Sequence, residues 1–144
     1  MRFADNEFGR RVLAGENPFQ VTDRASLDAY LGIVFTDPPW VPWPASRALI
    51  AQRRNDVAFE QHVLDGIGRG PESLLLQDEM AKISVPVLLL WCRDDRVIDV
   101  SAAEIFHQGL RDSRTVLLAG CGHMPMMAQP QNVAEAIDAF LAAK

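Results

Sequence analysis

The sequence has 144 residues, of which 49% are hydrophobic and 23% are charged, and its formal net charge is −5 at pH 7. This composition is ordinary for a globular protein and supplies enough apolar residues for one hydrophobic core. The negative charge argues against a nucleic-acid partner, because nucleic-acid binding needs a basic surface. The sequence contains no apolar run of roughly 18 residues and does not begin with a signal-peptide pattern, so we expect a soluble, cytoplasmic chain. Whether it associates with a membrane is left open by composition.

The residue pattern in the first part of the chain predicts short helices that are separated by helix-breaking residues. Residues 1–20 contain two glycines and a proline, which favours a loose lead-in with one helical turn. Thr22-Asp23 is a cap signal, and the apolar residues behind it recur at helical spacing. Pro38-Pro39 ends this helix, because each proline disfavours the helical conformation of the residue before it.

A second group of helices is expected farther along. Pro44 suits the first position of a helix, and a further helix is expected near residues 55–66. The glycines and the proline between residues 66 and 71 predict a clear break. A weak helical pattern follows over residues 72–82.

The pattern changes in the last part of the chain to alternating strands and helices. The continuous apolar run Val85–Cys92 predicts a buried strand, and Thr115–Ala119 predicts a second, shorter one. Between them, Ser101-Ala-Ala-Glu104 has the pattern of a capping box that begins a helix stopping near residues 109–112. Pro130 begins a last helix. Strand, helix, strand, helix at this spacing predicts an α/β fold with a mostly parallel sheet.

These patterns divide the chain into a helical segment, residues 1–83, and a βαβα segment, residues 84–144. Two strands are too few for a parallel sheet that is buried on both faces. We therefore expect the open sheet edge to bind a missing N-terminal half or a second chain.

Two residues at the strand ends can act together. Asp95 follows the first strand and His123 follows the second, so adjacent parallel strands would bring both side chains to one edge of the sheet. A carboxylate bound to an imidazole selects its tautomer and stabilises the imidazolium that forms when the ring takes a proton. A histidine without a neighbouring acid is more often a packing residue. The positions of Asp95 and His123 after successive strands favour a catalytic role instead.

The two cysteines, Cys92 and Cys121, lack the paired spacing of a zinc site. Their positions beside the two strand ends could bring them close together. Because free cysteines are usually buried, we predict two buried free thiols. No metal site is expected.

These residues resemble a known family. Trp91-Cys-Arg-Asp-Asp95 resembles the W-G-x-x-D turn that carries the acid of α/β-hydrolase-fold enzymes, and Gly122-His123-x-Pro125 resembles their histidine loop. Longer stretches resemble the monoacylglycerol-lipase-type and bacterial lipase and esterase branch. They are 85–91, 95–104 and 120–127, and more weakly 15–18, 34–35 and 38–39.

The resemblance implies a partial α/β-hydrolase fold, in which residues 1–83 form a helical cap or lid and residues 84–144 form the last two βα units. It implies that Asp95 is the acid and His123 the general base of a Ser-Asp-His triad. Asp94 and Asp99 are near rivals for the acid, but Asp95 alone fits the spacing of the turn.

The resemblance also implies a nucleophilic serine on a G-x-S-x-G turn. None of the six serines lies in such a pattern, so we expect the elbow and the oxyanion hole in an N-terminal half that precedes Met1. The parent protein would be an ester hydrolase, and the chain alone would be inactive.

The implied substrate is a carboxylic ester or acylglycerol with an apolar acyl chain, and no cofactor is needed. We predict that Trp40, Trp43 and the methionine cluster Met124, Met126 and Met127 line the acyl-binding surface, since flexible methionines suit irregular apolar ligands. Packing in an ordinary core is an equally good interpretation of both groups.

Two alternatives stay open. The chain could be a non-catalytic fragment or interaction module that binds another chain. The parent could also be a dehalogenase or epoxide hydrolase with an aspartate nucleophile. Two departures from the family pattern bear on the site: Cys92 stands where glycine is usual, and Ala128 stands where the branch often has glutamate.

Overall fold

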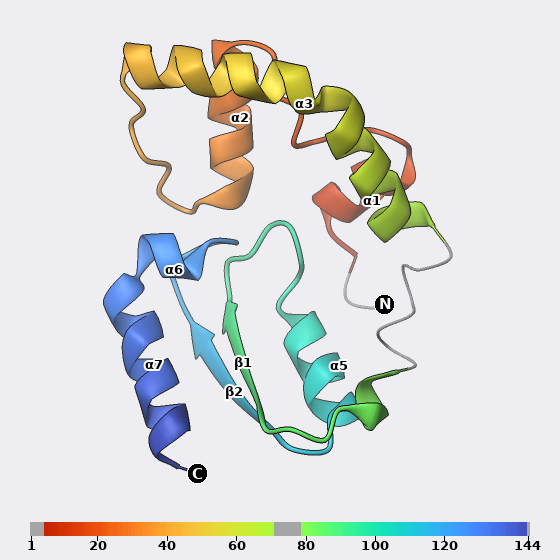
Figure 1. Cartoon of the computed structure of the whole chain (residues 1–144), viewed down its shortest axis with the longest axis vertical. Coiled ribbons are helices and arrows are strands. Elements are labelled where there is room, and N and C mark those ends of the chain that lie inside the picture. The colour runs from red at the N-terminus through yellow and green to blue at the C-terminus, as the bar shows by residue number, and fades with distance from the viewer. Residues whose placement is uncertain (1–4, 71–78, 144) are drawn as a thin grey trace.

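The computed structural model describes residues 5–70 and 79–143. In Figure 1 the helices α1, α2 and α3 form the upper part, and two strands with the remaining elements form the lower part. The upper helices are α1 (Glu7–Leu13), α2 (Arg24–Val34) and α3 (Trp43–Arg69). The lower elements are the 3₁₀ turn η2 (Met80–Lys82), β1 (Val87–Cys92), α5 (Ser101–Gly109), β2 (Ser113–Leu118), α6 (Pro125–Ala128) and α7 (Pro130–Ala142).

Helix α2 begins at the cap that its sequence predicts. The Asp23 side chain accepts a hydrogen bond from the Ser26 backbone N–H, and the Ser26 side chain accepts one from the Asp23 N–H. This reciprocal capping box satisfies two backbone donors that have no partner within the helix. The apolar side of α2 then packs into the first core cluster, which consists of Val21, Leu27, Leu31, Val34 and Phe35.

The expectation of two helices after Pro44 is wrong, because α3 runs without interruption from Trp43 to Arg69. Pro44 is the second residue of α3 rather than the first, and no further proline interrupts the helical hydrogen bonds before the helix ends. Gly68 lies inside the helix rather than in a turn. A Cβ at Gly68 would lie 2.5 Å from Cγ1 of Val12, so glycine lets α1 pack closely against α3.

The break predicted at residues 66–71 begins only at Gly70, where α3 ends. Of the weak helical stretch expected over 72–82, residues 72–78 lie outside the described part of the chain. Its last residues, Met80–Lys82, form a single 3₁₀ turn.

The two predicted strands pair in parallel, with Val87 opposite Ser113 and Cys92 opposite Leu118. Helix α5 connects them, and α5 and α7 lie on opposite sides of the strands (Figure 1). Within the described residues the sheet has only these two strands, so the outer edge of each is unpaired. The α/β fold class and the parallel sheet are therefore confirmed.

The cap of α5 differs from the predicted one. Ser101 is the first residue of the helix rather than its cap, and the Asp99 side chain accepts the Ser101 backbone N–H at 2.9 Å. Glu104 accepts a hydrogen bond from Gln108, one turn farther along, at 2.7 Å. The aspartate two residues upstream accepts the Ser101 N–H that the capping-box pattern assigned to Glu104, and such a turn is common for this side chain.

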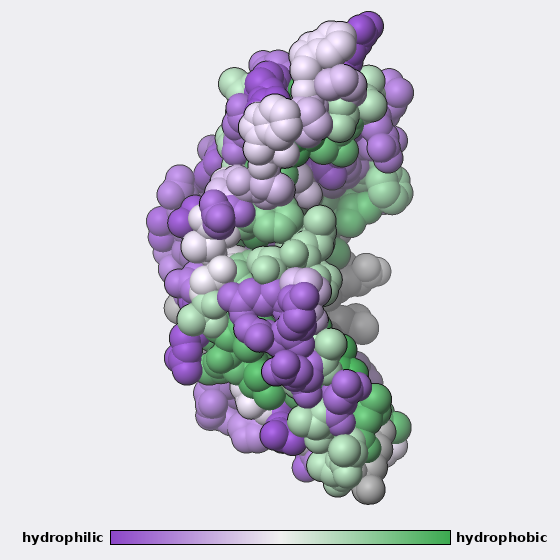
Figure 2. Space-filling view, turned by 90° about the vertical axis from the view of Figure 1, so that its left-hand side faces the viewer, coloured by the Kyte–Doolittle hydropathy of each residue, from purple (hydrophilic) through white to green (hydrophobic). Residues whose placement is uncertain are grey.

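Within residues 5–70 and 79–143, buried hydrophobic residues include two separate clusters. The second cluster, Met80, Leu89 and Leu110, packs β1 against α5 and η2. Large apolar side chains also reach the surface, among them Phe59, Ile67, Ile137 and Leu141. Figure 2 shows hydrophobic residues on the surface of both the upper and the lower part of the molecule. None of the helices within 5–70 and 79–143 combines the length and the apolar character that crossing a bilayer requires. The division of the chain at residue 83 stays a prediction.

From the first core cluster we predict how a substitution at Leu27 changes the free energy of unfolding. Leu27 is completely buried, so Leu27→Ala should lower the free energy of unfolding by about 2 to 5 kcal/mol through lost burial and a cavity. Urea denaturation followed by circular dichroism measures this value. The matched control is Leu13→Ala, because Leu13 is 65% exposed and should change little. Equal effects of the two substitutions would contradict the described core.

From the capping box we predict that the stability of the fold depends on pH through Asp23. The hydroxyl of Ser26 and then its backbone N–H lower the pKa of Asp23 below the ordinary value of 3.8. A lowered folded-state pKa stabilises the fold above the unfolded-state value, and this contribution disappears as the pH falls through the folded-state pKa. Asp23→Asn should therefore lower the melting temperature at neutral pH but not at pH values well below 3.8. Asp37→Asn, on the exposed loop after α2, serves as the control.

Candidate active site

The register of the sheet brings Asp95 and His123 together. Asp95 lies in the turn after β1 and His123 in the loop after β2, and parallel pairing places both at the same end of the sheet. The Nδ1 atom of His123 lies 3.0 Å from Oδ2 of Asp95. The Asp95 side chain is 6% exposed and that of His123 is 31% exposed. The acid is thus enclosed, while the imidazole reaches the surface.

Backbone donors orient the Asp95 carboxylate. Its Oδ1 accepts the N–H groups of Val97 at 2.8 Å and of Ile98 at 3.0 Å, which leaves Oδ2 for the imidazole. Trp91 supports the same turn, because its indole N–H donates to the Ile98 carbonyl at 3.1 Å. Since an ionised carboxylate can only accept, Nδ1 of His123 carries the proton and Nε2 is the nitrogen that can act as a base.

The histidine loop is fitted against the end of α2. The backbone N–H of His123 donates to the Val34 carbonyl at 2.7 Å. Gly122 has a φ of +61°, and a Cβ there would lie 2.6 Å from the same carbonyl oxygen. Only glycine combines this left-handed conformation with so close an approach. The first core cluster and the histidine loop are therefore in direct contact.

The prediction of two free thiols is wrong, because Cys92 and Cys121 form a disulfide. Their Cα atoms are 5.8 Å apart, which lies in the usual range for a cystine. Cys92 ends β1, and Gly120 has a φ of +76°, so the chain turns back after β2. Both cysteines are buried, as expected, but the turn brings them face to face.

The two rival acids make other contacts. Oδ2 of Asp94 accepts the Gly120 backbone N–H at 2.5 Å, and Oδ1 of Asp99 caps α5. Asp95 is therefore the carboxylate that contacts His123, as its spacing predicts. Sequence reasoning missed the role of Asp94, since nothing in its neighbourhood along the chain identifies Gly120 as a partner.

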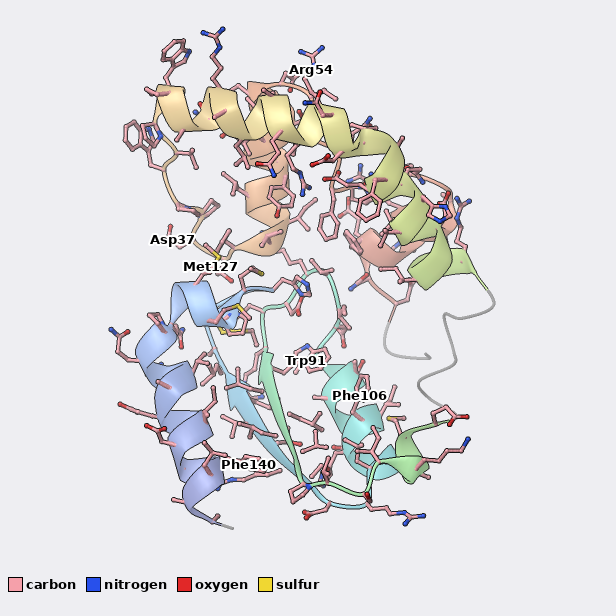
Figure 3. All side chains as sticks on the ribbon, in the orientation of Figure 1. Asp37, Arg54, Trp91, Phe106, Met127 and Phe140 are labelled. Atoms are coloured by element: carbon pink, nitrogen blue, oxygen red, sulfur yellow. A yellow bond between two sulfur atoms is a disulfide. The ribbon has the colours of Figure 1, made fainter. Side chains whose placement is uncertain are left out.

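Of the predicted substrate-binding residues, Met124 and Met127 line an apolar cavity of about 190 Å³. Figure 3 shows Met127 on α6 facing the loop that carries Asp37. The cavity extends into the first core cluster, and Arg53 and Tyr30 are its polar lining residues. Met126 is 54% exposed and is not part of the lining.

The two predicted tryptophans lie elsewhere. Trp40 is 80% exposed and Trp43 is 68% exposed. Trp43 lines a separate, open hollow of about 480 Å³ together with Arg24, Arg47 and Arg54. The guanidinium carbon of Arg47 lies 5.8 Å from the centre of the Trp43 ring. The structure therefore does not bring the tryptophans and Met124 together in one cavity.

Among the residues of 5–70 and 79–143, no group of three or more histidine, cysteine, aspartate or glutamate side chains is placed to hold a metal ion. The other two histidines lie outside the pair. His62 lies on α3, and Nδ1 of His107 contacts the Ser113 hydroxyl at 2.8 Å.

Comparison with known proteins identifies the family. Residues 2–136 match the sequence pattern of the alpha/beta hydrolase family. The chain belongs to this family. Mouse monoacylglycerol lipase ABHD6 is 39% identical over 67 residues, which cover 46% of this chain and 20% of the lipase. Lipase 3 of Moraxella sp. strain TA144 is 22% identical over 124 residues, or 86% of this chain and 39% of that protein.

The solved structures show the same fold. The crystal structure of a membrane phospholipase A described as a bacterial virulence factor has a TM-score of 0.83 and 32% identity. The match covers 99% of this chain and 46% of that one. The chain thus spans less than half the length of each relative described here. The resemblance to the lipase and esterase branch, and the partial α/β-hydrolase fold that it implies, are confirmed.

We predict that replacing Gly122 and Gly32 by alanine changes the free energy of unfolding in opposite directions. Gly122→Ala should lower the free energy of unfolding by more than about 1 kcal/mol, because alanine disfavours the left-handed conformation and its Cβ would clash with Val34. Gly32→Ala, in the interior of α2 with nothing within 4 Å of the new Cβ, should raise it by roughly 0.5 to 1 kcal/mol. Chemical denaturation of both variants tests the loop geometry, and a stabilising Gly122→Ala would contradict it.

Proposed function

We propose that this chain supplies the acid and the histidine of a Ser-Asp-His triad in an ester hydrolase. The observation that supports the proposal is the hydrogen bond between His123 Nδ1 and an Asp95 carboxylate held by two backbone donors. This bond selects the tautomer in which Nε2 can take a proton. The membership in the alpha/beta hydrolase family supports the same assignment.

In this proposal Nε2 of His123 takes the proton of a serine hydroxyl as the serine attacks the ester carbonyl. The imidazolium is stabilised by Asp95 and then gives its proton to the leaving alcohol. Water enters next, and the same nitrogen activates it to hydrolyse the acyl-enzyme. The serine lies on a G-x-S-x-G turn outside these 144 residues, because none of the six serines in the sequence lies in that pattern. The chain alone is therefore inactive.

We propose a carboxylic ester or acylglycerol as the substrate. The names of the relatives, a monoacylglycerol lipase and a phospholipase A, support an ester with an apolar acyl chain. Met124 and Met127 are the candidate acyl contacts, since they follow His123 closely in the sequence and line an apolar cavity. Trp40, Trp43 and Met126 remain candidate contacts for parts of the substrate outside the cavity. Residues 1–83 then serve as a cap over the site.

A second candidate function is an interaction module without catalysis. It is favoured by the unpaired outer edges of β1 and β2 in the described residues, which can accept a further strand. The sequence encoded directly upstream distinguishes the two functions. Strand patterns followed by G-x-S-x-G establish the serine hydrolase, and an aspartate in place of that serine indicates a dehalogenase or epoxide hydrolase. A true start codon at Met1 with no such neighbour favours the interaction module.

The catalytic proposal predicts the activity of variants in the protein that carries these residues together with the elbow. His123→Ala should lower kcat for hydrolysis of a monoacylglycerol by a factor on the order of 10⁶. Asp95→Asn should lower it by a factor on the order of 10⁴, because the amide no longer stabilises the required tautomer. Release of fatty acid measures both effects.

His107→Ala is the matched control, because His107 lies outside the Asp95–His123 pair and contacts Ser113 instead. Its kcat should stay close to that of the unchanged protein. Unchanged activity in His123→Ala would refute the assignment, and so would ester hydrolysis by the 144 residues alone.

A further inference from the structure

Three contacts join the turn after β1 to the loop after β2. The Cys92–Cys121 disulfide closes the inner end, and the Asp94 carboxylate accepts the Gly120 backbone N–H at the surface. The Asp95–His123 hydrogen bond is the third contact. All three connect residues 92–96, which we call the acid turn, with residues 120–123, which we call the histidine loop.

We propose that the Cys92–Cys121 disulfide, assisted by Asp94, is a positioning device that holds His123 against Asp95, so that the redox state of this cystine sets the geometry of the catalytic pair. This inference rests on the proposed function for its catalytic meaning. Its structural content concerns only the acid turn and the histidine loop.

The disulfide lies close to both members of the pair along the chain. Cys92 precedes Asp95 by three residues, and Cys121 precedes His123 by two. Cys92 is 1% exposed and Cys121 is completely buried, so both are also packed into the fold. A covalent bond this close to the pair limits how far the acid turn and the histidine loop can separate.

The remaining contacts between the two segments are weaker. The Asp94–Gly120 hydrogen bond lies at the exposed surface, where water competes for both groups. The Asp95–His123 hydrogen bond is the geometry that the other contacts maintain, so it does not count among them. Other contacts hold each segment from the helical part instead: the Arg96 guanidinium donates to the Gly32 carbonyl, and the His123 N–H donates to Val34.

Cys92 also stands where the family pattern usually has glycine, so the cystine is a feature of this chain rather than of the W-G-x-x-D turn. The exchange places a cross-link where the family pattern has only a flexible residue. A dithiol reagent reduces the cystine. The Sγ–Sγ bond breaks, each sulfur gains a proton and an electron, and the reagent closes to its own disulfide.

The test compares the oxidised 144-residue chain, the chain reduced with dithiothreitol, and the Cys92→Ala/Cys121→Ala variant. The variant avoids the need for the reagent to reach two buried sulfurs. Nuclear magnetic resonance gives two readouts. The first is the low-field Nδ1–H proton signal of His123, assigned by its loss in Asp95→Asn. The second is amide hydrogen exchange at Val97, Ile98 and His123, with Ser26 in the cap of α2 as the reference.

With the disulfide intact, we expect the Nδ1–H signal to be present and the three amides to be protected. Opening the disulfide by either route should broaden or abolish the signal and speed exchange at Val97, Ile98 and His123 by about tenfold or more. The reference amide of Ser26 should keep its rate. Reoxidation should restore the signal in the reduced chain.

Asp94→Ala tests the second contact in the oxidised chain. It should speed exchange at Gly120 and His123, whereas Asp138→Ala, which removes an exposed acid from α7, should not. An unchanged exchange rate at both amides in Asp94→Ala would overturn the part assigned to Asp94.

Two results would overturn the role of the disulfide. An unchanged Nδ1–H signal and unchanged exchange after opening would show that the cystine does not position the pair. Equal acceleration at Ser26 would show that it stabilises the whole fold without a specific effect on the site. Neither result depends on catalysis. If His123→Ala leaves ester hydrolysis intact, the proposed function fails while the positioning measurement stands.

Discussion

The parallel pairing of β1 with β2 is the constraint on which the site depends. In this register Cys92 lies opposite Leu118, so the segments that leave the two strands start side by side. The acid turn and the histidine loop need only a few residues each to meet. Two glycines with positive φ, Gly120 and Gly122, direct the second segment back toward the first. A shift of the register by one residue would separate Asp95 from His123 and exchange the faces of the strand.

The helical part of the chain contributes to the same site. The end of α2 accepts the His123 N–H at Val34, and Arg96 of the acid turn donates to Gly32 in the same helix. The helical part therefore contacts the segments that carry Asp95 and His123 on one side, and the sheet positions them on the other. Figure 1 shows α2 above the two strands. Residues 1–83 therefore contribute to the site, although Asp95 and His123 both follow residue 84.

The chain spans less than half of the relatives to which it was compared, and the sheet in its described residues has two strands that differ in composition. Every residue of β1 is apolar, whereas β2 includes the exposed Arg114 and Leu117. An apolar strand is suited to the interior of a sheet and a strand with exposed residues to its edge. The unpaired side of β1 is thus where the burial pattern favours further strands.

The sequence by itself determined the two strands, the cap of α2, the last helix and the pairing of Asp95 with His123. Each depends on local pattern or on spacing relative to a strand end, and both can be read along the chain. Tertiary structure alone decided that the cysteines are bonded, that Asp94 holds Gly120, and that α3 is one helix packed on Val12 through Gly68. These features join residues that are far apart in sequence, so no local signal specifies their partners. Physical proximity in the folded chain, rather than residue type, assigns their roles.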